Sequence, residues 1–177
     1  MPVSIDLESG YGSNSQAVGD TISRAIAAGA IVCNLEDSDP STGLIRTITE
    51  QQQRLCAAQD AVQTSGARFF INAHTDLFLQ AATAQHDTTM VSAALERAQA
   101  YADSGATAIF VPGLVDPALI GRVVKGSPLP VNVMVSSSTP TLAKLAELGV
   151  ARVSHGPGPF RSAMKALEQA ASAALLR

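Results

Sequence analysis

The sequence predicts an α/β fold with parallel strands, of the (β/α) TIM-barrel type, in which six of the eight βα units are present. Three observations predict it. Short apolar runs rich in Ile, Val and Phe alternate with longer helical stretches, which is typical of parallel strands joined by right-handed crossovers. Several helical stretches end in a glycine directly before the next run, as helix ends often do. Polar side chains gather where many of the runs end, as they do at the mouth of a barrel.

Six strands are expected from these apolar runs. Each run is too short for a helix and apolar enough to be buried on both faces of a sheet. A Gly-Ala or Gly-Val pair precedes four of them, and the glycine suits the left-handed residue that closes the preceding helix. The expected strands cover residues 3–7, 31–35, 68–73, 108–111, 130–134 and 151–154.

Helical segments fill the gaps between the strands. Asp116-Pro117 and Thr139-Pro140 predict helix starts, because in each pair a capping side chain precedes a proline in the first turn. No linker or low-complexity stretch divides the sequence, so we expect residues 1–177 to form a single partial (β/α)-barrel domain. The expected helices cover residues 15–28, 45–64, 89–104, 116–125, 139–148 and 159–176.

Two architectures accommodate this alternation, an open doubly wound sheet and a (β/α) barrel. The open sheet usually carries G-x-G-x-x-G after its first strand, whereas this chain has ESGYGSNS there. Polar residues instead follow several different strands, and in a barrel such strand ends converge on one mouth. A full barrel needs about 250 residues, so a chain of 177 residues is about two units short. The barrel is the favoured fold.

Composition excludes several classes of function. The net charge is −3 without a basic cluster, so we expect no nucleic-acid partner and no acidic membrane surface. The apolar runs are too short to span a bilayer, and the N-terminus lacks the basic start and apolar core of a secretory signal. Cys33 and Cys56 lack metal-ligand spacing and are both expected to be buried free thiols. A cytoplasmic protein is expected.

Carboxylates at the ends of the first two strands form the strongest candidate site. Asp6 and Glu8 follow the first strand, and Glu36 and Asp37 follow the second. Carboxylates that end neighbouring parallel strands lie close together and repel one another. A hard divalent cation held by one or two carboxylates and several waters, namely Mg²⁺, is the natural counter-charge. The alternative is that these side chains cap helices or bind backbone amides, which is the interpretation that we favour for Asp37.

Four other polar residues lie near the expected strand ends. His74 either takes part in a reaction or bonds to a loop carbonyl. Asn132 lies inside an apolar strand and needs a partner there, either a substrate or another polar group of the core. Tyr11 lies between two glycines and either covers the mouth of the barrel or contacts a ligand. His155 precedes a Gly-Pro-Gly-Pro run and is assigned to a tight turn.

The order and spacing of six segments resemble the phosphoenolpyruvate mutase/isocitrate lyase superfamily, and most closely its small carboxyphosphonoenolpyruvate phosphonomutase-like members. The resemblance covers essentially the whole chain. It implies a (β/α)8 barrel and Mg²⁺-dependent chemistry on small 2-oxo acids or their enolates. Members cleave or form C–C or P–C bonds beside a carboxylate, or decarboxylate or hydrolyse oxaloacetate-type substrates. The segments are IDLESGYG, CNLEDSDPSTG, FFINAHTD, AIFVPG, LPVNVM and VARVSHG.

The resemblance also implies roles for individual residues. Asp6 and Glu8 fall on the acidic pair that holds Mg²⁺ directly or through water. Glu36 falls on the strand-end glutamate that binds metal-bound water. The ion would polarise a 2-oxo acid and stabilise the developing enolate. We therefore expect Glu36 and His74 to be catalytic, and Tyr11 and Asn132 to bind substrate.

The chain departs from the superfamily pattern in three places. His74 stands where the family has an arginine that clamps the substrate carboxylate, and histidine lacks the fixed charge and the bidentate fork. The loop SDPSTGLIRT lacks the Lys-Lys-Cys-Gly-His of the lyase members, which argues against isocitrate or methylisocitrate lyase activity. The first two βα units of the family, which supply an Asp of the metal shell and a Ser-Gly segment, have no counterpart here.

Two functions follow as alternatives. The first is a Mg²⁺-dependent lyase- or mutase-like enzyme that acts on a small 2-oxo acid or its enolate and gives a pyruvate-type product. The second is a truncated, catalytically impaired member that acts as a binding or assembly scaffold. A barrel that lacks two strands has two open edges and an exposed core face. We therefore expect a homo-oligomer, a dimer or tetramer, in which the amphipathic segment 159–176 takes part.

Overall fold

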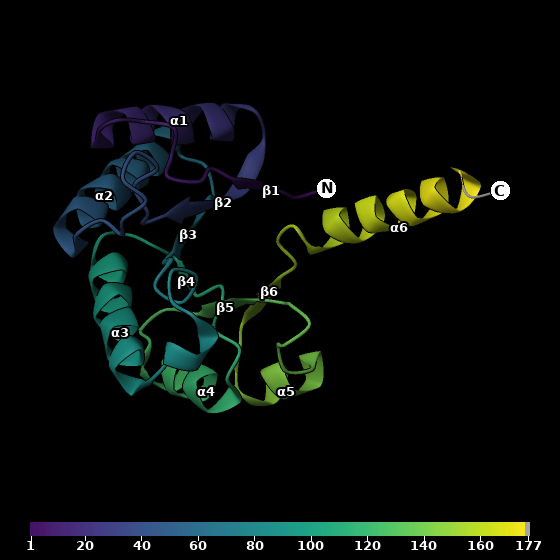
Figure 1. The fold of residues 1–177 in the computed structure, drawn as a ribbon. Coiled ribbons are helices and arrows are strands. Elements are labelled where there is room, and N and C mark those ends of the chain that lie inside the picture. The colour runs from purple at the N-terminus through teal and green to yellow at the C-terminus, as the bar shows by residue number, and fades with distance from the viewer. Residues whose placement is uncertain (176–177) are drawn as a thin grey trace.

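The computed structural model describes residues 1–175 and contains one sheet of six parallel strands. The strands lie in chain order, so each βα unit adds the next strand beside the last. Helices α1 to α5 follow one another around the outer side of the curved sheet (Figure 1). This confirms the expected partial TIM-barrel fold. The strands are β1 Val3–Asp6, β2 Ala30–Glu36, β3 Phe70–His74, β4 Ala108–Phe110, β5 Val131–Met134 and β6 Arg152–Ser154.

The helices begin where capping side chains satisfy free backbone amides. Asp116 caps α4 with Pro117 in the first turn, as predicted. The predicted start at Thr139-Pro140 is wrong, because Thr141 caps α5, while the Thr139 hydroxyl accepts a hydrogen bond from the amide of Ser136 at 2.9 Å. The helices are α1 Ser15–Ala27, α2 Ile48–Ser65, the 3₁₀ helix η1 Thr83–Gln85, α3 Thr88–Asp103, α4 Pro117–Gly126, α5 Leu142–Glu147 and α6 Gly158–Leu175.

The core lies between the outer face of the sheet and the helices. Cys33 and Leu35 of β2 point outward into this layer and are fully buried. Val18 and Ile22 of α1 are buried in the same layer, and α1 packs closely on α2 because Gly19 lets the carbonyl of Ala57 approach. Since side chains alternate along a strand, the residues between the outward ones face the interior of the barrel. The outer layer is therefore a complete core, whereas the inner face is free to carry polar groups.

Two expectations about burial are wrong. Burial of every strand on both faces fails for β1, where Val3 is 50% exposed, and for the N-terminal residues Ile31 of β2 and Phe70 of β3, which are exposed as well. Among the strands of residues 1–175, β1 lies at one end of the sheet and has a hydrogen-bonded neighbour on one side only. Burial of both thiols holds for Cys33 but not for Cys56, which is exposed on the outer surface of α2.

The last helix stands apart from the rest of the fold. Figure 1 shows α6 projecting away from the body toward the C-terminus, and none of its described residues is buried. Among the helices within residues 1–175, none is both long and apolar enough to cross a membrane.

Candidate active site

A cavity of about 740 Å³ lies on the inner face of the sheet and extends to the carboxyl ends of the strands. One side carries acidic residues and a histidine from β1 to β3, and the other carries basic residues from β6 and the segment after it. Apolar side chains lie between the two. Its lining includes Asp6, Glu36, His74, Phe110, Met134, Arg152, His155 and Arg161.

Glu36 ends β2 on the inner face and is half-buried. Burial raises the pKa of its carboxyl above the ordinary value, His74 opposes this rise, and the negative charges of Asp76, Asp6 and Glu8 add to it. A carboxylate that is costly to ionise beside other carboxylates is a group that a bound cation would stabilise. The parallel register pairs Glu36 with His74 of β3, so the two side chains lie side by side at the carboxyl ends of their strands. We call Asp6, Glu36 and His74 the acidic wall.

His74 is held between two carboxylates and is 5% exposed. Its Nε2 lies 2.9 Å from Oδ1 of Asp76, and its Nδ1 lies 3.4 Å from Oε1 of Glu36. The ring also packs against Phe110, with centroids 4.9 Å apart. Burial favours the neutral form of Asp76, but hydrogen bonds from His74 and Ser38 outweigh burial and lower the pKa of Asp76. His74 thus carries a proton on a ring nitrogen that a carboxylate faces, whichever tautomer is present.

Asp37, the residue after Glu36, points away from the cavity and is fully buried. Its carboxylate accepts hydrogen bonds from the backbone amide of Asp76 at 2.9 Å, from the Tyr101 hydroxyl at 2.8 Å and from Nη1 of Arg97 at 3.2 Å. Burial first, and then the charge of Asp37, raise the pKa of Tyr101 well above its ordinary value, so the hydroxyl remains a donor. We call Asp37, Arg97 and Tyr101 the Asp37 cluster. By binding a backbone amide it confirms the interpretation favoured for Asp37.

A buried arginine of α2 binds the turn after β1. Arg54 is 4% exposed, and its guanidinium donates to the carbonyls of Ser9 and Gly12. Glu8 and Tyr11 in this turn have φ of 48°, a left-handed conformation that costs non-glycine residues energy. The buried guanidinium accounts for the persistence of this conformation. It fixes the place of Glu8, whose backbone carbonyl accepts from the amide of Glu36 at 2.7 Å.

A second layer of polar side chains lies beneath the acidic wall. The side-chain Nδ2 of Asn72 on β3 donates to Oδ1 of Asn34 on β2 at 2.8 Å. Asn132 of β5 is fully buried and exchanges two hydrogen bonds with the Ser154 hydroxyl on β6, at 2.9 and 3.3 Å. Both amide atoms of Asn132 therefore have a partner inside the barrel, and Asn132 does not line the cavity.

The residues fit a magnesium ion that keeps most of its water. Within residues 1–175, no three Asp, Glu, His or Cys side chains are grouped so as to hold a metal ion by themselves. Mg²⁺ does not need such a cage, because it binds through one or two carboxylates and retains several waters. Asp6 and Glu36 line the same cavity, and their hard oxygen atoms suit this ion.

The structure brings together some of the predicted residues and separates others. Asp6, Glu36 and His74 meet on the cavity, as expected for a common site. Glu8 and Tyr11 lie in the turn beside it, at exposed positions, and Asn132 lies below it. The sequence did not single out Arg152, Arg161 or Phe110, which also line the cavity, and the turn assigned to His155 forms part of its rim.

For the missed residues, the sequence carried at most a weak signal. Arg152 is a charged residue at an inward position of a short strand, two residues before Ser154. Arg161 lies in a helix whose neighbours the sequence cannot reveal.

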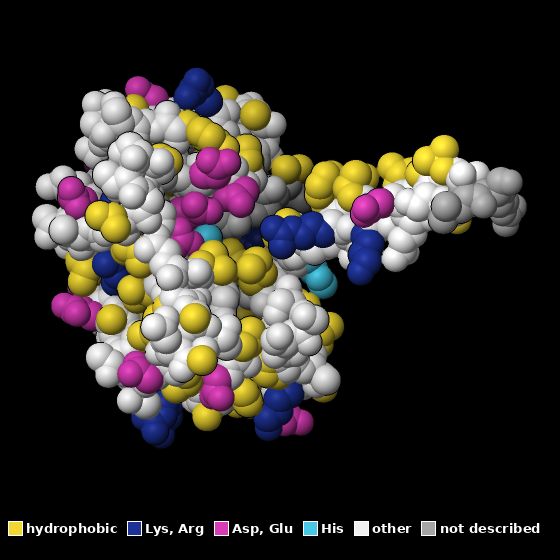
Figure 2. Space-filling model, viewed as in Figure 1, with side chains coloured by type: hydrophobic (Ala, Val, Ile, Leu, Met, Phe, Trp, Pro, Cys, Tyr) yellow, Lys and Arg dark blue, Asp and Glu magenta, His cyan; other side chains and the backbone are white. Residues whose placement is uncertain are grey.

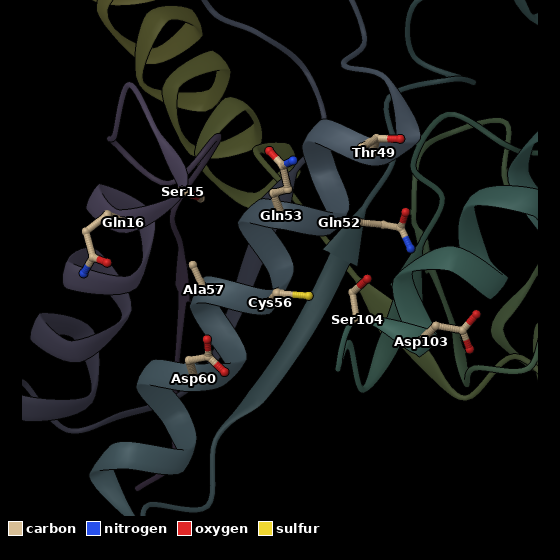
Figure 3. A pocket seen from close by; sticks show the side chains of 10 residues that line it. All are labelled: Ser15, Gln16, Thr49, Gln52, Gln53, Cys56, Ala57, Asp60, Asp103 and Ser104. Atoms are coloured by element: carbon tan, nitrogen blue, oxygen red, sulfur yellow. The ribbon is translucent and has the colours of Figure 1, made fainter.

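A second hollow lies on the outer surface, between α2 and the C-terminal end of α3 (Figure 3). Its volume is about 600 Å³, and it is lined mainly by glutamine, serine and aspartate side chains. The exposed thiol of Cys56 points toward Ser104 there. No histidine or arginine lines this hollow, so we assign the candidate site to the inner cavity.

Comparisons with known proteins agree with this geometry. Residues 1–175 match the family model described as phosphoenolpyruvate phosphomutase. A structure from Burkholderia cenocepacia named "putative phosphonomutase" superposes with a TM-score of 0.96 at 53% identity, covering 98% of this chain and 70% of that chain. An uncharacterized protein of Mycobacterium tuberculosis is 33% identical over 97% of this chain and 60% of its own length. The 2-methylisocitrate lyase of Salmonella typhimurium is 29% identical over 96% and 58%.

Coverage of the relatives is partial. The chain spans between 56% and 60% of the length of the curated relatives it matches. The match to both mutase-type and lyase-type proteins agrees with a superfamily that contains both kinds of enzyme.

Proposed function

The chain belongs to the phosphoenolpyruvate phosphomutase family, and from this premise we propose that it acts as a Mg²⁺-dependent lyase- or mutase-type enzyme on a small 2-oxo acid or its enolate. The observation that carries the proposal is the acidic wall. Asp6 and Glu36 line one cavity with His74, and burial and neighbouring carboxylates raise the pKa of Glu36. Bound Mg²⁺ would supply Lewis-acid polarisation of the substrate oxygen.

The side chains themselves would orient the substrate and hold a proton. Asp6 and Glu36 would hold the ion and its waters. His74, fixed by Asp76 at 2.9 Å, would hold a proton beside the reacting carboxyl group. Phe110, which packs against the His74 ring, would exclude water from that side. Tyr11 and Glu8 would close the cavity from the turn after β1, and Asn132 would act through Ser154.

Magnesium titration by calorimetry tests the metal site, and Mg²⁺-dependent release of pyruvate from candidate oxo acids tests the reaction. We expect binding and turnover that EDTA abolishes. Glu36→Gln should lose both, whereas the matched control Glu96→Gln, at an exposed position on α3, should keep both. No heat of Mg²⁺ binding to the intact assembly would overturn the proposal.

A second candidate is a catalytically impaired member that serves as a binding or assembly scaffold. It is favoured by the environment of His74, whose two ring nitrogens face the protein's own carboxylates. Mg²⁺ binding without turnover of any oxo acid would favour this candidate over the enzyme. The two free cysteines agree with the reducing cytoplasm proposed for either.

We further propose that α6 packs on a second copy of the chain, giving a dimer or tetramer. Phe160, Met164 and Leu167 recur at helical spacing and are 67%, 44% and 63% exposed, which is a stripe that a partner would bury. Light scattering after size-exclusion chromatography should give an oligomer for the wild type and a monomer for Leu167→Glu. The control Gln169→Glu, on the opposite side of the helix, should remain oligomeric. A monomeric wild type would contradict the idea.

A further inference from the structure

Two loop residues that do not line the inner cavity are connected to His74 through Asp76. Ser38 belongs to the loop that follows β2, and Gln80 belongs to the loop that follows β3. Figure 2 shows a histidine side chain beside gathered Asp and Glu side chains on the face of the molecule that it displays. Which nitrogen of such a histidine carries the proton depends on how the neighbouring carboxylates are oriented.

Gln80 joins the two loops. Its side-chain Nε2 donates to the Ser38 hydroxyl at 3.1 Å and to the carbonyl of Gly43 at 2.9 Å. Both acceptors belong to the loop after β2. The backbone amide of Gln80 donates to the carbonyl of Asp76 at 2.9 Å, so the side chain starts from a backbone that is itself held in place.

The Ser38 hydroxyl orients the carboxylate of Asp76. A serine hydroxyl has one proton to donate, and because Gln80 donates to the oxygen, this proton is left for Asp76. The structure shows the Ser38 hydroxyl donating to Oδ2 of Asp76. The backbone amide of Asp76 is bound as well, since it donates to Asp37 at 2.9 Å. With its backbone and Oδ2 both bound, Asp76 presents Oδ1 in one direction.

Oδ1 of Asp76 faces the ring of His74. The Nε2 of His74 lies 2.9 Å from this oxygen, whereas Nδ1 lies 3.4 Å from Oε1 of Glu36. Unshared electron pairs of nitrogen and oxygen repel each other at 2.9 Å, so this contact requires a proton between the two atoms. The ring is buried and packs against Phe110, which opposes its rotation. The closer contact therefore selects Nε2 as the protonated nitrogen of a neutral ring.

We propose that Ser38 and Gln80 are positioning residues for His74, which orient Asp76 so that the neutral ring carries its proton on Nε2 and presents Nδ1 to Glu36 as an acceptor. The inference rests on the proposed function for the use of Nδ1 in the reaction, whereas the tautomer is a property of the protein without ligand. Nδ1 is then the nitrogen that can take a proton released in the reaction. The imidazolium so formed faces one carboxylate at each nitrogen.

Nuclear magnetic resonance measures the tautomer directly. Correlation spectra of ¹H and ¹⁵N are recorded for the full chain with ¹⁵N-labelled histidine, in EDTA, at a pH above the ordinary histidine pKa of about 6.5. The sequence contains three histidines, so His86→Gln and His155→Gln identify the signals of His74 by elimination. We expect a protonated Nε2 and an unprotonated Nδ1. A protonated Nδ1, alone or together with Nε2, would overturn the proposal.

Substitutions in the two loops assign the tautomer to the positioning residues. Ser38→Ala should lower the ratio of Nε2–H to Nδ1–H about fivefold, as expected for the loss of one hydrogen bond. Gln80→Met should lower it less, and Ser38→Thr, which keeps the hydroxyl, should retain it. The matched control is Ser41→Ala in the same loop, since the Ser41 hydroxyl donates to Asp39 at 2.7 Å instead. An unchanged ratio in Ser38→Ala, or an equal change in Ser41→Ala, contradicts the assignment.

Asp76→Asn gives the sharpest test of the role of Ser38. The Ser38 hydroxyl should bind the amide oxygen of the asparagine, which directs the amide nitrogen at Nε2 and moves the ring proton to Nδ1. Adding Ser38→Ala should relax this inversion, because the amide can then turn over. An inversion of equal size in the single and double variants would show that Ser38 does not orient residue 76.

Metal binding and turnover separate this inference from the proposed function. Asp76→Asn should lower kcat at least about tenfold through the wrong tautomer, while calorimetry still detects Mg²⁺ binding. A tautomer that depends on Ser38 in a chain that binds no Mg²⁺ supports the positioning role and overturns the proposed function. Mg²⁺-dependent turnover with His74 protonated on Nδ1 does the reverse. An inverted tautomer with an unchanged kcat overturns the use of Nδ1 in the reaction.

Discussion

Glu36 and Asp37 are neighbours at the end of one strand, and the fold gives them opposite environments. Asp37 is fully buried and accepts three hydrogen bonds from Asp76, Arg97 and Tyr101. Glu36 faces the cavity, and its pKa is raised by burial and by other carboxylates. The Asp37 cluster is therefore electrostatically complete, whereas the acidic wall has an excess of negative charge.

The difference separates two uses of the same residue type. A buried carboxylate with donors on every side holds the ends of β2 and β3 together. A half-buried carboxylate with few donors destabilises the protein alone and becomes favourable when a cation binds. Substitutions in the two regions should therefore change stability in opposite directions.

Asp37→Asn should give the largest loss of stability. The substitution keeps the shape but leaves Arg97 without its counter-charge and replaces an acceptor of the Asp76 amide with a weaker group. We expect the free energy of unfolding, measured by urea titration, to fall by about 3–5 kcal/mol. Asp60→Asn, at an exposed position of α2, is the matched control. Equal midpoints for the two variants would show that the Asp37 cluster contributes little.

Tyr101→Phe should rank second. It removes one buried hydroxyl that donates to Asp37 at 2.8 Å and leaves the other donors in place. A hydrogen bond to a charged group contributes about 1.5–3 kcal/mol, which urea unfolding can resolve. Tyr11→Phe provides the comparison, because Tyr11 is 62% exposed. A stronger effect at Tyr11 than at Tyr101 would contradict the assignment.

Thr47→Ala should rank third, and it lies outside both regions. Thr47 caps α2 and forms a capping box with Glu50, and loss of such a cap costs about 1 kcal/mol. Thr49→Ala, at the second residue of the same helix, should cost less because Thr49 does not cap the helix. Thermal unfolding of both variants checks the order.

The same cap makes a pH prediction. Hydrogen bonds from Thr47 lower the pKa of Glu50. The stabilisation that ionised Glu50 gives the fold is therefore present above the ordinary glutamate pKa, and it is lost as the pH falls through the lowered folded-state pKa. The difference between wild type and Thr47→Ala should therefore shrink in acid. A difference that grows in acid would refute the assignment.

Glu36→Gln should have the smallest effect on stability and the opposite sign. The raised pKa of Glu36 means that ionisation costs stability, and that cost develops as the pH rises through the folded-state value. Without Mg²⁺, the variant should therefore be more stable than the wild type at neutral pH, by less than about 1 kcal/mol. With Mg²⁺, the wild type alone should be stabilised. Calorimetric melting with and without the ion measures both.

Much of the fold could be predicted from local patterns. Alternation of apolar runs and helical stretches predicted six parallel strands in chain order, because each run is complete within a few residues. The strand ends predicted that Asp6, Glu36 and His74 would share a site. The start of α5 could not be predicted in this way, because threonine can cap a helix at either position 139 or 141, and the turn in which the Thr139 hydroxyl accepts from the Ser136 amide leaves Thr141 as the cap.

The sequence by itself determined, to within one residue, where each strand ends, and through strand parallelism it determined that the carboxylates of the acidic wall line one cavity. The tertiary structure alone decided that Asp37 turns into a buried cluster while Glu36 faces the cavity, and that Arg152 reaches Ser4 across the interior. The physical reason is the range of the interactions. Strand and helix patterns act over a few residues, whereas these contacts join residues 64 and 148 positions apart. The first needs α3 to pack on the sheet, and the second needs the sheet to curve.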